Sequence, residues 1–190
     1  MADRQSCKSS GRASDRRSIV LVGHMGAGKS SIGRRLAKCL NMPFRDADDE
    51  IVRAAGCSVE DIFSLYGEQA FRDGERKVIM RLLDGKPIVL ATGGGAFMDE
   101  TLREKIAACG ISVWLRVGLD MLVARTEHRE GRPLLKNKDV RTTLQALMDQ
   151  RDPVYALADL TVDAKGDSPE ETAEHVHNAI GRYLERKTAS

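Results

Sequence analysis

The sequence predicts an α/β fold of three layers, in which helices cover both faces of a five-stranded parallel sheet. Two observations lead to this prediction. Short apolar runs alternate along the chain with segments of helical periodicity, as they do where helices connect the strands of a parallel sheet. The first apolar run also leads directly into a glycine-rich loop at residues 23–30, an order typical of a strand, a tight turn and a helix start.

Each element can be placed from its residues. We expect strands at 18–22, 43–46, 88–91, 111–116 and 160–163, and helices at 29–40, 48–55, 59–66, 68–84, 99–108, 119–126, 139–150 and 169–186. The last helix has a clear start, because Ser168 is followed by proline at the first helical position and by Glu171 three residues after the cap. Arg151 lies just before Pro153, where we expect a helix to end or restart.

The composition is that of an ordinary globular domain of 190 residues. Its net charge of +2, from 30 basic and 28 acidic residues, is too balanced for a general nucleic-acid binder. The longest apolar stretches are far shorter than the roughly 20 residues of a membrane helix. We therefore expect neither a nucleic acid nor a membrane as partner. We also expect a monomer, although nothing in these features determines the oligomeric state.

The cysteines and histidines do not form a recognisable metal or redox motif. The four cysteines are widely spaced and include no C-x-x-C pair, which favours free thiols in a reducing cytosol and a cytoplasmic location. The four histidines offer no ligand set, since His175 and His177 are two apart on a predicted helix and point away from each other.

The first 17 residues differ in composition from the rest of the chain. They are rich in serine and arginine and lack the apolar region of a secretory signal. We interpret residues 1–17 as a disordered N-terminal extension, with a short targeting peptide as the alternative. Residues 18–187 are then a single domain.

The glycine-rich loop carries the most specific chemical signal. Residues 23–30 read GHMGAGKS, a complete phosphate-binding loop at the end of a predicted strand. The glycines allow backbone N–H groups to approach phosphates, and the helix that follows directs its positive end at them. Lys29 would then reach the β- and γ-phosphates, and Ser30 would supply a hydroxyl ligand to Mg²⁺. The alternative is a glycine-rich turn that fits the pattern by chance.

Two carboxylates follow the second predicted strand. Because side chains alternate along a strand, Asp46 and Asp48 should lie on the same side of its end and face the ligand crevice of a parallel sheet. The alternative is that the acidic run only caps and charges the first turn of the next helix. That second role suits Asp49 and Glu50.

Arg72 and Glu75 are three residues apart on a predicted helix, so the glutamate can hold the guanidinium in a fixed pose. A surface ion pair would have the same spacing. After the third strand come three consecutive glycines, Gly93, Gly94 and Gly95, which usually mean that a group approaches the backbone closely.

Residues 125–138 are rich in arginine and lysine and contain Gly131 and Pro133, which break a helix. We interpret this segment as a mobile cationic lid that covers a transferring phosphoryl group and excludes water. A plain solvated loop is the alternative, but it would be less consistently basic.

In this combination and order, the motifs resemble those of the shikimate kinases, a family of P-loop kinases. The resemblance covers about residues 18–186 and rests on the loop 23–30, Asp46-Ala47-Asp48, residues 58–75, the three glycines, and the segments 132–135 and 151–155. It implies a P-loop kinase with a substrate-binding region at 46–75 and a lid at 125–138. It also implies ATP-dependent phosphorylation of the shikimate 3-hydroxyl, on the pathway to chorismate and the aromatic amino acids.

The resemblance also assigns roles to residues. Its implied catalytic residues are Lys29, Asp48 and Arg132. Its implied ATP-binding residues are Gly26, Ala27, Gly28, Lys29, Ser30, Ser31, Arg125 and Arg132, with Arg125 near the adenine. The shikimate-binding residues would be Asp48, Arg72, Gly93, Gly94, Gly95 and Arg151, with both arginines on the substrate carboxylate. Mg²⁺ would be held by Ser30 and, through water, by Asp46.

Two other functions fit parts of the pattern. A gluconate kinase has the same kind of phosphate loop, but an uncharged polyol chain does not need two arginines, whereas the shikimate carboxylate suits a planar cation. A non-catalytic regulator that binds ATP and a ligand is the second alternative. Such a protein would be free to lose a catalytic side chain, yet Lys29, Ser30, Asp46, Asp48 and Arg132 are all present.

Overall fold

Five parallel strands form one sheet in the order β2-β3-β1-β4-β5 in the computed structural model, which describes residues 17–126, 139–166 and 168–189. The strands are β1 (Ser18–Val22), β2 (Phe44–Asp46), β3 (Val89–Ala91), β4 (Gly110–Arg116) and β5 (Leu160–Asp163). In the centre of the sheet, Ile19 lies opposite Val89 of β3 and Ile111 of β4. The predicted five-stranded parallel sheet is confirmed.

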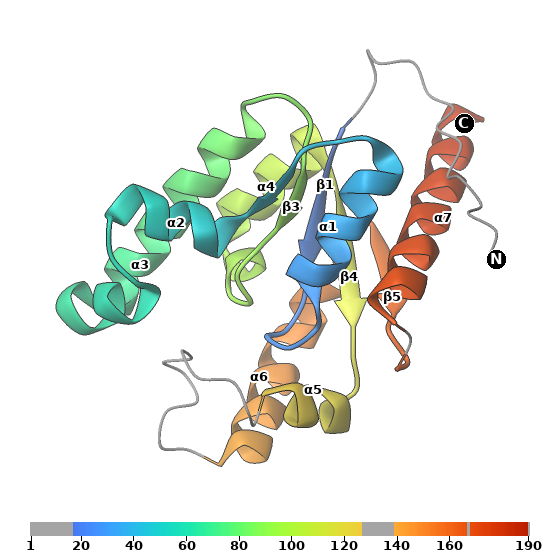
Figure 1. Ribbon diagram of the computed structural model, residues 1–190. Helices are drawn as coiled ribbons and strands as arrows, with labels where there is room; N and C mark the ends of the chain where they lie inside the picture. Colours follow the sequence, from blue (N-terminus) through green and yellow to red (C-terminus); the bar gives the residue numbers. More distant parts are fainter. Residues whose placement is uncertain (1–16, 127–138, 167, 190) are drawn as a thin grey trace, which may run out of the picture.

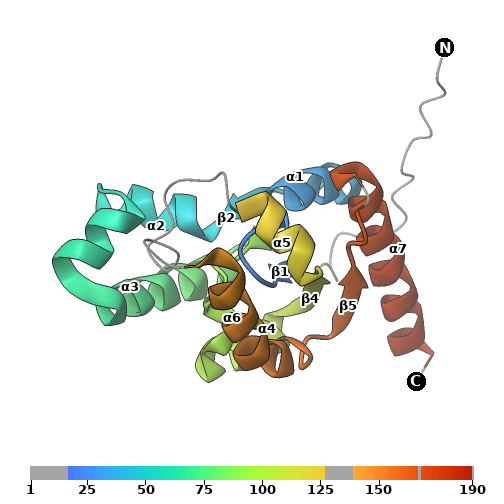
Figure 2. The same cartoon turned by 90° about the horizontal axis from the view of Figure 1, so that it is seen from below.

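The helices cover both faces of this sheet. They are α1 (Lys29–Leu40), α2 (Ala47–Ala55), α3 (Val59–Leu83), α4 (Glu100–Cys109), α5 (Leu119–Thr126), α6 (Val140–Tyr155) and α7 (Pro169–Thr188), with a short 3-10 helix η1 (Ala96–Met98). Helices α1 and α7 lie side by side on one face, and α4 and the second half of α3 lie on the other (Figures 1 and 2). The three-layer prediction is therefore confirmed.

The alternation of side chains along β1 divides the core in two. Ile19 and Leu21 pack with α1 and α7 on one face, whereas Val20 and Val22 pack with α3 and α4 on the other. All five residues of β1 are buried, which explains why this strand is a continuous apolar run in the sequence. A third, smaller cluster joins α2 to α3 beyond the edge of the sheet.

Most predicted boundaries lie within one or two residues of the observed ones, and two of the differences have a clear physical cause. The helix expected to stop at residue 150 continues through Pro153 to Tyr155. Proline lacks an N–H and leaves one carbonyl of the preceding turn without a helical partner, but that carbonyl belongs to Asp149, an exposed residue that water can reach. The helix expected at residue 48 begins at Ala47, because the Asp46 side chain accepts a hydrogen bond from the Asp48 N–H and caps it.

The break expected between two helices is confirmed. Residues 59–66 and 68–84 were expected as two helices, and α3 is interrupted between them at Gly67, whose φ is 81°. Cys39, Cys57 and Cys109 are free thiols. Within the described ranges, no helix is both long enough and apolar enough to cross a membrane.

Gly33 allows α1 to approach the sheet closely. A Cβ atom at this position would lie 2.6 Å from Cε2 of Phe44 and 3.1 Å from Cδ1 of Leu21. We expect Gly33→Ala to lower the free energy of unfolding by about 1–3 kcal/mol, as overpacking usually does. Gly181→Ala is the matched control in α7, since nothing lies within 4 Å of its Cβ position and alanine should stabilise that helix by about 0.5–1 kcal/mol. Urea unfolding measures both, and equal stability of the two variants would contradict the prediction.

Candidate active site

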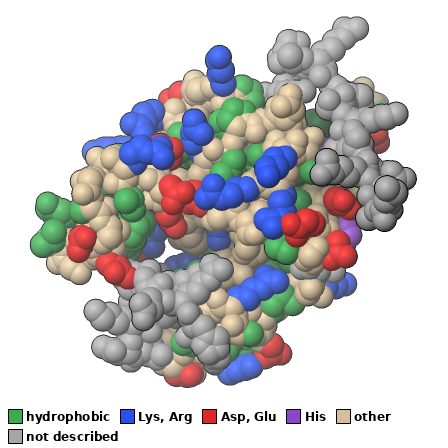
Figure 3. All heavy atoms as spheres, in the orientation of Figure 1, with side chains coloured by type: hydrophobic (Ala, Val, Ile, Leu, Met, Phe, Trp, Pro, Cys, Tyr) green, Lys and Arg blue, Asp and Glu red, His purple; other side chains and the backbone are tan. Residues whose placement is uncertain are grey.

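A cleft of about 750 Å³ opens at the carboxyl ends of the strands. It is lined by the loop after β1, the end of β2, α3, the glycine triplet after β3 and α6. The surface is hollowed here, between the part carried by α2 and α3 and the part carried by α5 and α6 (Figure 3). In parallel α/β folds, ligands bind outside the carboxyl ends of the strands, so the position of the cleft is that of a ligand site.

The phosphate-binding loop joins β1 to α1 as predicted. Gly26 and Gly28 have φ values of 82° and 90°, a left-handed conformation that glycine adopts without strain. Gly28 is the N-cap of α1 and offers no capping side chain, an arrangement in which the N–H groups of the first turn can receive an anion. The loop therefore has the conformation that phosphate binding requires.

Lys29 is held inside this loop. Only 9 % of the residue is exposed, and its Nζ donates hydrogen bonds to the carbonyl oxygens of Gly23 at 2.6 Å and His24 at 2.8 Å. A buried ammonium group needs such acceptors because its desolvation is costly. The charge of Lys29 is thus fixed beside the loop before any ligand arrives.

Ser30 and Asp46 lie together at the mouth of the loop. The Ser30 hydroxyl donates a hydrogen bond to Oδ2 of Asp46 at 2.5 Å, and the other carboxylate oxygen accepts the Asp48 N–H at 3.1 Å. Asp46 itself therefore caps the N-terminus of α2, the role that was the alternative for the acidic run. Within the described residues no cluster of three or more histidine, cysteine, aspartate or glutamate side chains could hold a metal ion. One hydroxyl and one carboxylate nevertheless suit Mg²⁺, which keeps several waters and binds phosphate oxygens.

Asp48 also lines the cleft, but not for the reason expected. The strand ends at Asp46, so Asp48 is on the first turn of α2 and the alternation of side chains along a strand does not apply to it. Asp48 is exposed to solvent as a residue. Its carboxyl group nevertheless has protein atoms on most sides. Burial, and then the neighbouring charge of Asp46, raise the pKa of Asp48, and Lys29 opposes this change.

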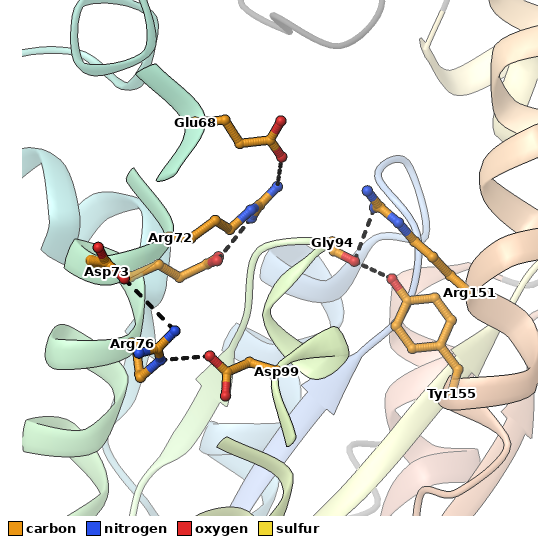
Figure 4. A network of polar contacts seen from close by, with 9 residues as sticks. Glu68, Arg72, Asp73, Arg76, Gly94, Asp99, Arg151 and Tyr155 are labelled. Carbon is orange, nitrogen blue, oxygen red and sulfur yellow. Dashed lines mark hydrogen bonds and ion pairs between the residues drawn. The ribbon is translucent and has the colours of Figure 1, made fainter. Parts of the chain in front are cut away.

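Arg72 points into the cleft from α3. Its guanidinium donates to Glu75 at 2.8 Å and to Glu68 at 3.1 Å (Figure 4). Glu75 is 1 % exposed, so the predicted pair is confirmed and the alternative of a surface ion pair is wrong. Burial lowers the pKa of Arg72, but the two glutamates, Glu75 first, outweigh this effect and raise it. The guanidinium is therefore charged and held in one orientation.

The glycine triplet packs against this pair. A Cβ at Gly93 would lie 2.4 Å from Oε1 of Glu75, and a Cβ at Gly95 would lie 2.6 Å from an Arg72 nitrogen. The glycine triplet predicted that a group approaches the backbone closely. That group is not a ligand but the side chains of Glu75 and Arg72. At Gly94, which also lines the cleft, a Cβ would lie 3.5 Å from an Arg151 nitrogen and from the Met25 backbone nitrogen, an ordinary van der Waals distance.

Arg151 approaches the same loop from α6. Its guanidinium donates to the Gly94 carbonyl at 3.1 Å, and the Tyr155 hydroxyl donates to the same oxygen. Arg72 and Arg151 lie on opposite sides of the loop that carries Gly94 (Figure 4). Burial raises the pKa of Tyr155 to about 12, so its hydroxyl stays protonated and can donate this bond.

The structure brings most of the predicted residues into one cleft. Those that line it are Gly26, Gly28, Lys29, Ser30, Ser31, Asp46, Asp48, Arg72, Gly93, Gly94, Gly95, Arg125 and Arg151. Ala27 does not line the cleft, because its side chain is buried in the core. Arg132 and most of the expected lid, residues 127–138, lie outside the described residues.

Sequence reasoning missed two contacts of this site. Tyr155 is four residues after Arg151, a spacing that places both on one face of a helix and could have identified it. The bond between His24 and Asp152 joins residues 128 apart in the chain. No local pattern could have indicated that contact.

Comparison with known protein sequences supports the resemblance found in the motifs. The family model described as shikimate kinase matches residues 25–181. The shikimate kinase of Paramagnetospirillum magneticum is 54 % identical over 169 residues, which cover 89 % of this chain and 87 % of that protein. The shikimate kinase of Brucella canis is 49 % identical over 172 residues, covering 90 % of this chain and 86 % of that protein.

Solved structures give matches of two kinds. A shikimate kinase from Acinetobacter baumannii, solved in complex with shikimate, superposes with a TM-score of 0.85 at 36 % identity and covers 87 % of this chain and 93 % of its own. A gluconokinase from Sinorhizobium meliloti superposes with a TM-score of 0.55 at 21 % identity, with 89 % and 97 % covered. This second likeness concerns the fold alone.

Proposed function

Because this chain belongs to the shikimate kinase family, we propose that its cleft holds the shikimate carboxylate between Arg72 and Arg151 and the phosphates of ATP on the loop 23–30. The reaction is ATP-dependent phosphorylation of shikimate, which gives shikimate 3-phosphate and ADP. The observation that supports the proposed site best is the position of the two guanidinium groups. They come from different helices and reach the glycine loop from opposite sides, beside Asp48.

The chemistry of the substrate matches this arrangement. Shikimate is a small anion with three hydroxyls, and a guanidinium can bind a carboxylate through two parallel hydrogen bonds. Asp48 lies near Gly93, with Oδ1 3.2 Å from the Cβ position of that glycine. A carboxylate there can accept a hydrogen bond from a substrate hydroxyl and orient its oxygen toward the phosphoryl group.

Lys29 and the backbone of the loop would stabilise the charge that develops during transfer. Phosphoryl transfer spreads negative charge over the oxygens of the moving group, so a fixed cation lowers the barrier most when it is aimed there. Gly26, Ala27, Gly28 and Ser31 belong to the same proposed ATP site, Ala27 through its backbone. Arg125 lines the cleft nearby, and the roles of Arg132 and the lid at 125–138 stay predictions from the sequence.

The proposed magnesium site uses Ser30 directly and Asp46 through water. Mg²⁺ held by these residues would supply positive charge that neutralises the phosphates of ATP. What supports the proposal is that the Ser30 hydroxyl and the Asp46 carboxylate already lie together beside the loop. We further propose that residues 46–75 form the shikimate-binding region of a single domain, 18–187. The extension at 1–17, the monomeric state and the cytoplasmic location stay predictions from the sequence.

A coupled assay of ADP release with shikimate, with gluconate and with neither tests the substrate assignment. We expect turnover with shikimate alone. Turnover with gluconate would favour the polyol kinase, and binding of both ligands without turnover would favour the regulator.

Lys29→Ala is expected to lower kcat by about 10²–10³, the effect of removing one donor to a developing charge. Shikimate affinity, measured by calorimetry, should change little because Lys29 faces the phosphates. Lys105→Ala is the control, since that lysine lies on α4, pairs with Asp84 and lines no part of the cleft. A large loss of shikimate affinity with kcat intact would contradict the assignment, and Arg132→Ala can be tested in the same way.

A further inference from the structure

One buried contact connects the phosphate-binding loop to the helix that carries Arg151. The imidazole of His24, in the loop, lies with Nε2 2.6 Å from Oδ1 of Asp152 in α6. His24 is 3 % exposed, whereas the Asp152 side chain is 31 % exposed and keeps contact with solvent. The sequence pattern assigns no function to this histidine.

His24 contacts both halves of the proposed site. Its backbone carbonyl accepts the hydrogen bond from Lys29, and its ring packs edge-on against Tyr155, with 5.0 Å between the centroids and 88° between the planes. Tyr155 in turn donates to the Gly94 carbonyl, the same oxygen that Arg151 contacts. His24 thus lies between Lys29, which is proposed to face ATP, and Arg151, which is proposed to face shikimate.

The chemistry of the bond follows from its partners. A carboxylate only accepts hydrogen bonds, so Nε2 must carry the proton. Burial lowers the pKa of His24, and the charges of Lys29 and Arg151 lower it further, while Asp152 opposes this change. The contact is therefore a hydrogen bond from a neutral imidazole to a carboxylate. A buried donor that loses its partner costs more than a solvated one, so the pair holds the loop and α6 together.

We propose that His24 is a positioning residue, which through Asp152 keeps the phosphate-binding loop and Arg151 in the relative position that phosphoryl transfer requires. This inference rests on the proposed function of the cleft. The residue would not touch either substrate. It would act by fixing the distance between the two halves of the site, where a small displacement of reacting groups can cost a large factor in rate.

The pair can be broken from either side. His24→Leu removes the donor and Asp152→Ala removes the acceptor, and each should lower kcat/KM for shikimate by about 10- to 100-fold. The double variant should be no slower than either single one, because both changes remove the same contact. His24→Gln should restore the rate to within about threefold, since its amide nitrogen is as many bonds from Cα as Nε2 of histidine and can donate the same hydrogen bond.

Ser112→Ala is the control for a purely structural effect. Ser112 is buried and exchanges hydrogen bonds with Asp159 at 2.7–2.9 Å, away from the cleft. This variant should unfold at a lower temperature and keep its kinetic constants. If His24→Leu and Asp152→Ala behave in the same way, or if His24→Gln is as slow as His24→Leu, the proposal is wrong. Should His24→Leu fail to fold, Asp152→Ala still decides, because its side chain is partly exposed.

Fluorescence of Trp114 separates this proposal from the proposed function. It is the only tryptophan of the chain, and its ring lies 5.9 Å from that of Tyr155. Trp114 also lies beside Gly23 of the phosphate loop, so addition of ATP alone should change its emission in the parent and in His24→Gln, and clearly less in His24→Leu. The same change in the parent and in His24→Leu, or none in the parent, would overturn the proposal. A parent that shows the expected emission but no turnover of shikimate would instead overturn the substrate assignment.

Discussion

Asp48→Asn is expected to lower kcat by about 10²–10⁴, the range for one acid–base group, and to leave ATP affinity and the fold intact. The substitution keeps the size of the side chain and removes its charge. Because the transition state of phosphoryl transfer is loose, the carboxylate should act mainly by orienting the attacking oxygen and accepting its proton late in the reaction. Steady-state kinetics measure the loss, and circular dichroism checks the fold.

The pKa of Asp48 adds a second readout. Burial and the charge of Asp46 raise it, so the carboxyl group of the parent takes up a proton at a higher pH than an ordinary aspartate. Activity of the parent should therefore fall as the pH drops through this raised pKa. Asp48→Asn has no carboxyl group to protonate and should lack that decline.

Asp49→Asn is the matched control for this experiment. Asp49 is the next residue of α2, but it is exposed and does not line the cleft. Its Oδ2 lies 3.6 Å from Nη2 of Arg34. The rate of Asp49→Asn should equal that of the parent. If Asp48→Asn turned over shikimate at more than about a tenth of the parent rate, Asp48 would have no part in proton transfer, and the acidic pair would only cap α2 and support the metal.

Arg151→Ala should weaken shikimate binding by about 2–5 kcal/mol, the usual cost when a desolvated charge loses its partner. At about 1.4 kcal/mol for each tenfold change, the dissociation constant rises by a factor between roughly thirty and a few thousand. MgATP binding should be nearly unchanged, because the guanidinium lies beside Gly94 rather than in the phosphate loop. Calorimetry with each ligand measures both.

Arg72→Ala should weaken shikimate binding to a similar extent and should also destabilise the fold. It leaves Glu75 buried with no cation beside it, a situation that typically costs about 3–5 kcal/mol. Arg141→Ala is the control, because this arginine lies on α6 with Arg151 but pairs with Asp120 outside the cleft. Normal KM values for shikimate in Arg72→Ala and Arg151→Ala would mean that both residues are structural and that the substrate binds elsewhere.

The sequence predicts those parts of the molecule that depend on neighbours in the chain. The strand, loop and helix around Lys29 follow from an apolar run and glycine spacing, and the contact of Arg72 with Glu75 follows from helical periodicity. The alternation of side chains predicts Asp48 in the cleft only for a strand that continues past Asp46, and β2 ends there. Asp48 lies in the cleft because Asp46 caps α2 and directs the first turn into it.

Other parts depend on contacts between distant segments, which spacing does not encode. Pro153 predicted that a helix ends or restarts, but the exposure of Asp149 and the packing of Tyr155 in the core allow α6 to continue. The triplet at residues 93–95 indicated a close approach without identifying what approaches. Only the fold shows that Glu75 and Arg72 fill the space beside it.

The close packing of Gly93 and Gly95 against Glu75 and Arg72 also restricts how this chain can evolve. Any side chain at Gly95 would displace the guanidinium of Arg72, and any side chain at Gly93 would collide with the carboxylate that holds it. Replacing the arginine alone would leave a buried acid without its counter-charge. Single mutations at Gly93, Gly95 or Arg72 should therefore cost binding or stability. A descendant that accepts an uncharged substrate is expected to change the glycine loop and the ion pair together.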